Sequence, residues 1–247
     1  MSFKPRSHIV ERPGYKPTHP QEAFIVPLLH QYITEALNSY ASNPKPEARV
    51  IDIGCGRQPF RKDLELLGYH YIGFDVKQNP EEKVDVIAEI DTNFLHKYPR
   101  LGEFEFIICT EVLEHVAQWH IAFENLFRMT APAGKVLITC PQFYPLHEEP
   151  YDFWRPTNHA LEYYATKVGF QILEQTNAGD IWDILGTTLG SYRELYLRSS
   201  SLKSKIIYRL IRYSYKWILK QLLKKNIQRH VGIRSLSYLS NVIVLQK

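Results

Sequence analysis

The amino-acid sequence predicts an α/β fold organised around a mostly parallel sheet. Short apolar runs typical of strands alternate along the chain with helical or irregular stretches, which is the pattern of a sheet whose strands are joined by helical crossovers. The first run, residues 49–53, passes directly into an Asp-x-Gly-x-Gly turn at residues 52–56. Because ligands bind such sheets at the carboxyl ends of the strands, we expect a ligand site at this turn.

A helix is expected ahead of the sheet, over residues 19–41. Its periodic apolar residues are Phe24, Leu28, Ile33 and Leu37. This spacing is typical of a helix with one apolar face, and it predicts a cover helix lying across the sheet edge. The proline-containing stretch 43–46 then separates this helix from the first strand.

Five further runs predict strands, because they are rich in β-branched and aromatic residues and are separated by helical or irregular stretches. They cover residues 69–75, 84–91, 104–109, 135–139 and 241–245. The chain has 247 residues, of which 45% are hydrophobic and 23% are charged, so we expect a single domain, residues 1–247, with one sizeable core.

The glycine turn has the chemistry of a ligand-binding loop. Gly54 and Gly56 lack Cβ atoms and can take positive φ, so the turn can be tight and expose its backbone N–H groups. Asp75 ends the next expected strand about 20 residues later, where nucleotide-binding units place the acceptor for ribose hydroxyls. A plain connecting turn, with Asp75 as a strand-end cap, is the alternative.

Four motifs in order carry a resemblance to a known family. They are Ile-Asp-Ile-Gly-Cys-Gly (51–56), Gly-Phe-Asp (73–75), Ile-Cys-Thr-Glu-Val-Leu-Glu-His-Val (108–116) and Ala-Gly-Lys-Val-Leu-Ile-Thr-Cys-Pro (133–141). Over residues 48–177 the chain resembles the class I S-adenosylmethionine-dependent methyltransferases, in the small-molecule branch with a Leu-Glu-His motif. The resemblance implies a Rossmann-like three-layer sandwich with a mostly parallel seven-stranded sheet. It also implies a helical insertion at 178–240 and an antiparallel last strand at 241–247.

The resemblance implies S-adenosylmethionine as cofactor and S-adenosylhomocysteine as product. The turn at 52–56 would wrap the methionine portion, Asp75 would hold the ribose, and residues 90–91 would border the adenine. Glu111 and His115 would lie near the sulfonium methyl group. The expected cofactor-binding residues are Asp52, Gly54, Cys55, Gly56, Asp75, Val76, Ile90, Asp91, Thr110, Glu111 and His115.

A nicotinamide dinucleotide is the nearest competing cofactor. Its phosphate loop requires Gly-x-Gly-x-x-Gly, and Pro59 stands at the third glycine position here. Gln58 likewise replaces a glycine that is frequent in the methyltransferase loop. The sequence therefore favours methyl transfer over hydride transfer.

The stretch 140–157 follows the fifth strand and is rich in proline, aromatic and charged residues. Such a loop can cover a methyl donor and bind an acceptor. The expected substrate-binding residues are Tyr144, His147, Tyr151, Asp152, Trp154 and Arg155. The alternative is aromatic packing with Arg155 paired to Asp152 or Glu149. The segment also resembles a methyltransferase subset often associated with bacterial surface-glycan or lipid biosynthesis.

Methyl transfer to an alcohol requires a general base, and histidine suits this task because its pKa lies near neutrality. His147 is the first candidate because acids that could orient its ring lie beside it in the loop. His115 is the second candidate, expected at the start of the helix after the fourth strand. A structural role is the alternative for both histidines.

The C-terminal part of the chain differs in charge from the rest. From Arg198 onward there are 12 Lys or Arg and no Asp or Glu, whereas residues 1–197 hold 18 basic and 26 acidic residues. Cations recur at helical spacing among aliphatic and aromatic residues, which is typical of a membrane-surface helix. We therefore expect residues 203–230 to contact an anionic membrane surface. The alternatives are a helix packed on the domain and, less favoured, RNA binding.

Several other classes are disfavoured. No His-Glu-x-x-His motif occurs and the histidines are scattered, so no metal site is expected. The three cysteines are odd in number, and the first residues carry charges and no apolar run, so we expect a cytoplasmic protein, with peripheral attachment to the inner face of the membrane. No run of 18 apolar residues could span a membrane.

The resemblance and the loop chemistry together predict methyl transfer to an oxygen of a small-molecule, sugar or lipid-linked acceptor. An RNA methyltransferase that uses the basic tail, and a non-catalytic module that binds the cofactor or a membrane, are the alternatives. Nucleic acid is the less expected partner, and the sequence leaves the acceptor and the oligomeric state open.

Overall fold

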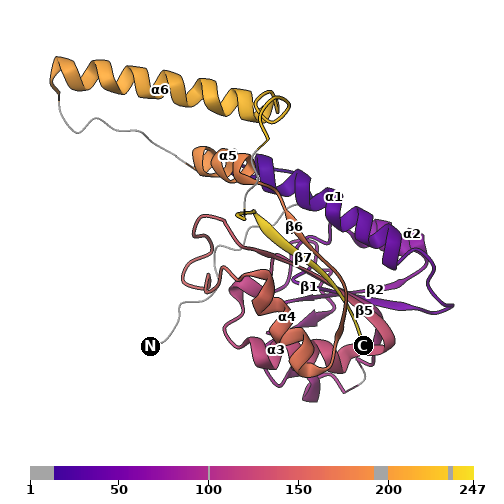
Figure 1. Cartoon of the computed structure of the whole chain (residues 1–247). Helices are drawn as coiled ribbons and strands as arrows, with labels where there is room; N and C mark the ends of the chain where they lie inside the picture. The colour runs from indigo at the N-terminus through magenta and orange to yellow at the C-terminus, as the bar shows by residue number, and fades with distance from the viewer. Residues whose placement is uncertain (1–13, 100, 192–199, 233–235) are drawn as a thin grey trace.

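The computed structural model describes residues 14–99, 101–191, 200–232 and 236–247 (Figure 1). A seven-stranded sheet in the order β3-β2-β1-β4-β5-β7-β6 forms its centre. All ladders from β3 to β5 are parallel, and β7 runs antiparallel to both β5 and β6. The strands are β1 Arg49–Ile53, β2 His70–Asp75, β3 Val86–Ile87, β4 Phe104–Thr110, β5 Thr130–Pro141, β6 Gln171–Ala178 and β7 Ser240–Gln246. The fold class predicted from the sequence is confirmed.

Helices cover both faces of the sheet, which makes three layers (Figure 1). They are α1 Glu22–Tyr40, α2 Arg61–Leu67, α3 Trp119–Met129, α4 Asn158–Val168, α5 Ile181–Ser191 and α6 Leu202–Leu223. The central strand β4 shows why both faces need cover. Its Phe106 and Ile108 join the core under α1, and Ile107 and Cys109 join the core under α3 and α4. All four side chains are fully buried, so this strand is apolar in every direction.

Helix α1 packs on a face of the sheet rather than at its edge. Leu29 and Ile33 are buried in the same cluster as Val50 of β1, Leu137 of β5 and Val244 of β7. Periodicity identifies an apolar helix face but not its partner, which explains why the expected position at the edge was wrong. The consequence for the site is direct, because the first turns of α1 reach the carboxyl end of the sheet.

Two strands differ from expectation. The run 84–91 contributes only Val86–Ile87 as β3, because β2 ends at Asp75, which pairs with Ile87, and the chain beyond turns away. The edge strand β6, Gln171–Ala178, was not among the predicted runs. It carries mostly polar residues, and its place in the sheet comes from pairing with the apolar β7. Edge strands have little apolar signal because one side faces solvent.

In its described residues, the insertion between β6 and β7 contains helices α5 and α6. Residues 192–199 and 233–235, and with them Arg198, lie outside the described residues, as do residues 1–13 at the start of the chain. Helix α5 packs on α1 by placing Gly186 against the ring of Phe24, where a Cβ atom would lie 2.4 Å from two ring carbons. This close approach joins the insertion to the wall of the site.

The replacement Gly186→Ala should lower the stability of the protein by about 1–3 kcal/mol, because the added methyl group overpacks the contact with Phe24. Helix propensity alone predicts the opposite sign, a gain of about 1 kcal/mol. Urea denaturation of both proteins measures the difference. A more stable variant would contradict the packing described.

Candidate functional site

A cavity of about 520 Å³ lies at the carboxyl ends of β1, β2 and β4, closed on one side by α1 and on another by the loop after β5. Its volume falls within the range of small-molecule sites. Thirteen of the predicted site residues line it: Asp52, Gly54, Cys55, Gly56, Asp75, Val76, Ile90, Asp91, Thr110, Glu111, His115, Tyr144 and His147. The other four, Tyr151, Asp152, Trp154 and Arg155, are not among the residues that line it.

The glycine turn is tight, but it does not expose its N–H groups as expected. The amides of Gly54 and Cys55 both donate to the carbonyl of Phe74, at 2.8 and 3.0 Å, and that of Gly56 donates to Asp75 Oδ2 at 2.9 Å. Gly54 has φ +71°, and a Cβ there would lie 2.3 Å from Val112 Cγ2. The turn therefore allows close approach of a ligand without offering the free amides that a pyrophosphate needs.

Asp75 lies at the end of β2, as expected from its place in the sequence. Its carboxylate accepts backbone N–H groups from Gly56 at 2.9 Å and Val76 at 2.7 Å. Burial raises its pKa, although these backbone donors partly oppose the rise. A carboxylate has about four acceptor positions, so Asp75 can also accept a hydroxyl group.

Asp52 is buried in the floor of the cavity, where it accepts the hydroxyl of Tyr71 at 2.7 Å. Burial raises the pKa of Asp52 to about 7, with the hydrogen bond from Tyr71 opposing and the charge of Asp75 adding to the rise. Near neutral pH this carboxyl group is balanced between its two forms, so a bound cation would shift it to the carboxylate.

Ile90 and Asp91 border the cavity because three hydrogen bonds fix their segment. Asn125 Nδ2 donates to the carbonyls of Ile90 and Thr92, both at 2.8 Å, and the Gln118 amide donates to Asp91 Oδ2 at 3.0 Å. The chain after β3 is thus held against the start of α3 and the segment before it.

Glu111 follows β4 in the left-handed region, with φ +54°. Its Oε1 accepts the hydroxyls of Thr139 of β5 and Ser240 of β7, each at 3.0 Å. Strained non-glycine residues of this kind gather at functional sites. Here the strain is held by two neighbouring strands.

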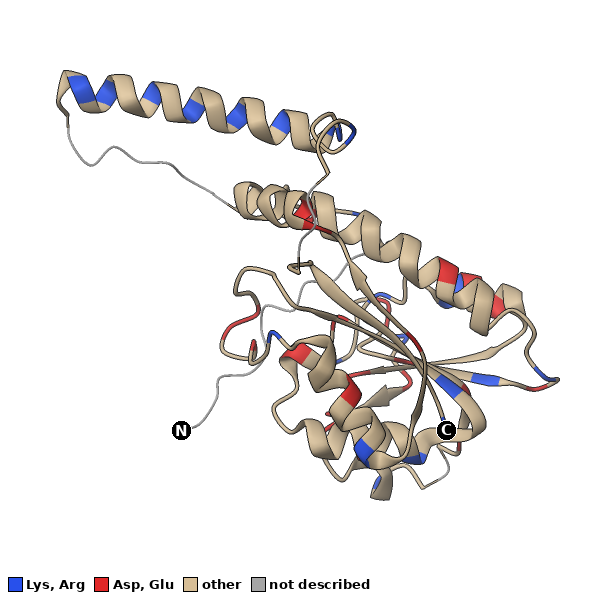
Figure 2. Cartoon of the chain, in the orientation of Figure 1, with Lys and Arg blue, Asp and Glu red and all other residues tan. Residues whose placement is uncertain are grey.

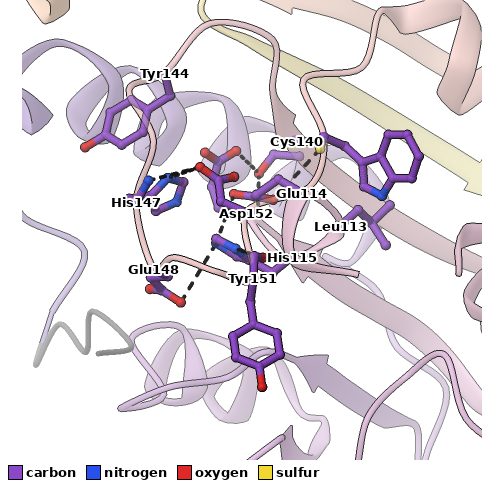
Figure 3. A network of polar contacts seen from close by, with 12 residues as sticks. Leu113, Glu114, His115, Cys140, Tyr144, His147, Glu148, Tyr151 and Asp152 are labelled. Atoms are coloured by element: carbon purple, nitrogen blue, oxygen red, sulfur yellow. Dashed lines mark hydrogen bonds and ion pairs between the residues drawn. The ribbon is translucent and has the colours of Figure 1, made fainter. Parts of the chain in front are cut away.

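His115 and His147 lie edge to face at the cavity, with ring centroids 4.7 Å apart (Figure 3). His115 belongs to the 3₁₀ turn Leu113–His115, so it does not start a helix as expected; α3 begins at Trp119. Its Nδ1 lies 2.9 Å from the carbonyl of Tyr151. A carbonyl only accepts, so Nδ1 carries the proton and Nε2 keeps the basic lone pair.

His147 is oriented by its own loop. Its Nδ1 lies 3.2 Å from both the Pro145 carbonyl and Asp152 Oδ2. Both of these neighbours accept hydrogen bonds, and they lie nearer to Nδ1 than the donor Arg155 Nη2, which is 3.5 Å away. Nδ1 is therefore assigned the proton, which leaves Nε2 as the basic nitrogen. Burial lowers the pKa of His147, and the charge of Asp152 opposes this. Burial lowers the pKa of His115 as well.

Arg155 and Asp152 hold the loop together. The two terminal nitrogens of Arg155 donate to the two oxygens of Asp152, at 2.6 and 2.7 Å, and its Nε donates to the Tyr144 carbonyl at 3.0 Å. Burial raises the pKa of Asp152, but the bonds from Arg155 and His147 outweigh it and leave the pKa below its usual value. In the sequence analysis, the pairing of Arg155 with Asp152 or Glu149 was the structural alternative to substrate binding by this loop, and the structure shows the pair with Asp152.

Trp154 and Tyr151 also serve the loop. Trp154 Nε1 donates to the Val116 carbonyl at 2.8 Å, and its ring lies 6.2 Å from that of Trp119. The carbonyl of Tyr151 accepts from His115, as above. Together with the Phe153 amide, which donates to the Glu114 carbonyl at 2.8 Å, these bonds attach the loop to the segment after β4.

Comparison with known proteins agrees with this geometry. A family model described as "Methyltransferase domain" matches residues 28–175, which is more than half of the chain. The chain belongs to this methyltransferase family. The resemblance to the S-adenosylmethionine-dependent class I enzymes predicted from the sequence is thereby confirmed at the level of the family, with S-adenosylmethionine as its methyl donor.

Curated relatives of this methyltransferase are partial matches. The ubiquinone biosynthesis O-methyltransferase of Rickettsia akari is 25% identical over 122 residues, which cover 47% of this chain and 49% of the relative. That of Dechloromonas aromatica is 26% identical over 136 residues, covering 51% and 53%. The chain spans about half the length of the curated relatives it matches.

Solved structures share the fold of this methyltransferase. A SAM-dependent methyltransferase from Archaeoglobus fulgidus has a TM-score of 0.52 at 17% identity, covering 88% of this chain and 94% of that one. The cyclopropane synthase MmaA2 from Mycobacterium tuberculosis also has a TM-score of 0.52, at 14% identity, covering 87% and 84%.

The charge of the cavity fits S-adenosylmethionine. Among its lining residues are eight carboxyl groups and one guanidinium, that of Arg57. S-adenosylmethionine carries a sulfonium and an ammonium group, whereas a dinucleotide carries phosphates. The carboxyl groups are those of Glu22, Asp52, Asp75, Glu89, Asp91, Glu111, Glu114 and Glu148. The raised pKa values of Asp52 and Glu114 reduce their share of the negative charge, but acidic groups still far outnumber the one guanidinium, so the wall attracts a cationic ligand and repels an anionic one.

Sequence reasoning missed Glu114 as a site residue. Its side chain is fully buried, lines the cavity, and its Oε1 has no hydrogen-bond partner within the described part of the chain. Burial and then the charge of Glu111 raise its pKa well above the usual value. Its place in the Leu-Glu-His motif was the available signal.

The sequence analysis also missed the cavity wall that α1 supplies. This wall consists of Glu22, Ile25, Val26 and Leu29, and the residues Tyr15, His19 and Gln21 before the helix extend it.

The topology brings together three groups that are scattered in the sequence. Glu114, His115 and His147 each offer one potential ligand atom, and these three atoms lie within 4.8 Å of one another. This spacing could hold a metal ion. Scatter along the chain was therefore not a sound reason for expecting no metal site. The expectation of no metal in this methyltransferase stays a prediction, and a chelator tests it below.

The replacement Asp152→Asn should lower the pKa of His147 further, because it removes the charge that opposes burial. Titration of the His147 ring by NMR measures the change. Glu149→Gln, at an exposed acid of the same loop, is the matched control and should leave the titration unchanged. An unchanged or raised His147 pKa in Asp152→Asn would show that the carboxylate does not act on the ring.

Proposed function

We propose that this chain transfers the methyl group of S-adenosylmethionine to an oxygen of a small-molecule acceptor, which can be a sugar or lipid-linked molecule. The observation that carries the proposal is the contact between buried His115 and half-buried His147 beside an acid-lined cavity at the carboxyl edge of the sheet. The relatives named O-methyltransferases support oxygen as the methylated atom. The cofactor supplies the electrophilic methyl group.

The cofactor side of the cavity is assigned from the contacts above. Residues 52–56 border the methionine portion, and Asp52 pairs with its ammonium group. Asp75 accepts the ribose hydroxyls with Val76 beside it, and residues 90–91 border the adenine. Thr110, Glu111 and His115 lie where β4 and the following turn meet the reacting centre.

His147 is the proposed general base, acting through Nε2. Asp152 lies 3.2 Å from Nδ1, so its charge stabilises the imidazolium that forms when Nε2 takes the acceptor proton. Positioning of the acceptor contributes the larger share of the rate enhancement. An in-line displacement depends on the alignment of the reacting atoms, and alignment can lower the barrier by roughly 7–11 kcal/mol. His115 is the second candidate; its Nε2 lies 3.8 Å from Glu114 Oε1 and 3.9 Å from Glu148 Oε2.

The acceptor side is proposed to lie between the loop and α1. Tyr144 places its ring edge-on to His147, with centroids 5.1 Å apart, and Leu146 is 71% exposed at the mouth. Ile25, Val26 and Leu29 supply an apolar wall opposite. This combination fits an acceptor with a polar reacting end and an apolar body. Tyr151, Asp152, Trp154 and Arg155 shape the loop that faces it.

We also propose a cytoplasmic location with peripheral attachment to the inner face of the membrane through residues 203–230. All three cysteines are buried and free, which fits a reducing compartment. Within the described residues, no helix has the length and apolar character needed to cross a bilayer. The cations of α6 support attachment to an anionic surface.

Binding of S-adenosylmethionine should release a proton from Asp52. Its pKa is about 7 in the free protein, so at pH 6 most of it is protonated, and a bound ammonium favours the carboxylate. Calorimetry in buffers of different ionisation enthalpy should show release of up to about one proton at pH 6 and less at pH 8. The Asp52→Asn variant should lose this component; equal release from both proteins would refute the role of Asp52.

His147→Ala should lower turnover by roughly 10²- to 10⁴-fold while leaving the affinity for S-adenosylmethionine nearly unchanged. S-adenosylhomocysteine formation with phenol, glycan and polyprenyl acceptors measures turnover. The neutral ring of His147 is the base, so the wild-type rate should rise with pH until this ring is deprotonated. Because burial lowers the pKa of His147, the midpoint of this rise should lie at a pH below the ordinary pKa of histidine. If the enzyme holds no metal ion, as expected, a metal chelator should leave the wild-type turnover unchanged.

Loss of both turnover and cofactor affinity in His147→Ala would assign His147 a structural role. Cofactor binding without turnover on any acceptor would favour a non-catalytic module. Turnover on RNA alone would replace the small-molecule assignment.

A further inference from the structure

Three side chains in the C-terminal half of helix α6 attach it to the domain. Leu222 is fully buried, Ile218 packs on the core under α1 and α5, and the hydroxyl of Tyr215 donates to the carbonyl of Leu189 in α5. These residues lie on one side of the helix. The 22-residue helix is about 33 Å long, and its N-terminal half extends away from the sheet (Figure 1).

A second row of apolar side chains on α6 faces solvent. Its members recur every three or four residues, so they form one continuous row along the helix. They are Leu202, Ile206, Leu210, Tyr213 and Trp217, and each is between 51% and 76% exposed. Soluble domains rarely leave a contiguous apolar row of this length in water, and such rows mark interaction surfaces.

A row of cations lies beside the apolar row. It consists of Lys205, Arg209, Arg212, Lys216 and Lys220, all exposed, and α6 contains no acid (Figure 2). At 3.6 residues per turn the two rows are roughly 80° apart around the helix axis, and both are turned away from the row that packs on the domain. The helix therefore has a packed face, a cationic face and an apolar face.

We propose that α6 lies on an anionic lipid bilayer, with the apolar row inserted among the acyl chains and the cationic row on the lipid headgroups. The inference rests on the membrane attachment proposed above, and it names the lipid class and the residues that contact it. A helix with adjacent apolar and cationic faces matches the boundary between acyl chains and headgroups.

Other occupants fit these rows less well. RNA would pair with the cations but would leave the aliphatic side chains in water. A second copy of the chain would bring two cationic rows together, since α6 has no acid to pair with them. The domain itself is already packed against the third face of the helix.

The contacts of α6 also connect the bilayer to the cavity. Helix α6 packs on α5, α5 packs on α1 through Gly186 and Phe24, and both Ile25 of α1 and Ser191 of α5 line the cavity. A bilayer-bound α6 thus holds the apolar α1 wall near the lipid surface. This arrangement suits an acceptor that is itself anchored in the membrane.

Flotation of the full chain tests the proposal, using vesicles of phosphatidylcholine alone or with one-third phosphatidylglycerol. Wild type should bind the anionic vesicles and bind the neutral ones much more weakly. Leu210→Ser with Trp217→Ser should weaken binding at least roughly tenfold, because two inserted side chains are lost. Arg209→Glu with Lys216→Glu should weaken vesicle binding at least roughly 25-fold, because the loss of each cation near an anionic surface weakens binding about fivefold.

Matched controls are available on the domain. Leu66→Ser with Tyr163→Ser removes two side chains of similar exposure, 76% and 58%, outside α6. Lys62→Glu with Lys97→Glu makes the same change in net charge at exposed positions. Both control variants should bind the vesicles like wild type. All substituted positions are solvent-exposed, and circular dichroism confirms folding.

Four results would overturn the proposal. They are no binding of wild type to anionic vesicles, equal binding by the apolar-row variant, equal binding to both vesicle types, and binding of an RNA oligonucleotide or self-association in place of vesicle binding. Calorimetry with S-adenosylmethionine on the same preparation separates this proposal from the enzymatic one. Failed flotation with intact cofactor binding refutes only the bilayer contact, and the reverse result refutes only methyl transfer.

Discussion

Burial of carboxyl groups at the carboxyl edge of the sheet is the constraint on which the site depends. Asp52, Asp75 and Glu114 each lose most of their water, and burial is the leading cause of the raised pKa of all three. Ionised acids in such surroundings are costly unless they are paired or hydrogen-bonded. The protein supplies partial compensation, from Tyr71 to Asp52 and from backbone amides to Asp75. In the proposed function, the cationic groups of S-adenosylmethionine compensate Asp52 further.

The loop that carries His147 is held from three directions. Arg155 fixes it internally through Asp152, and the Glu114 carbonyl fixes its far end through the Phe153 amide. The amides of Gln142 and Phe143, at its start, both donate to the carbonyl of Leu239, at 2.8 and 2.9 Å. Leu239 precedes β7, the strand to which the chain returns after α6. The last strand therefore supports the site as well as the sheet.

The sequence predicted the parts of the site that lie at strand ends. Asp52, Asp75 and Glu111 follow or end apolar runs, and parallel strands bring those ends to one edge of the sheet. The pairing of His115 with His147 could not be predicted, since the two are 32 residues apart and meet only because β4 and β5 are neighbours. The burial of Glu114, the α1 wall and the direction of the glycine amides likewise depend on tertiary packing, which periodicity does not describe.

The most direct test of the account is calorimetric titration of the full chain with S-adenosylmethionine, compared with the Asp75→Asn variant. The account predicts saturable one-to-one binding by wild type, and at least tenfold weaker binding by a variant that folds normally, since an amide accepts the ribose hydroxyls more weakly than a carboxylate does. No binding by wild type, or equal affinity of the two proteins, would contradict it.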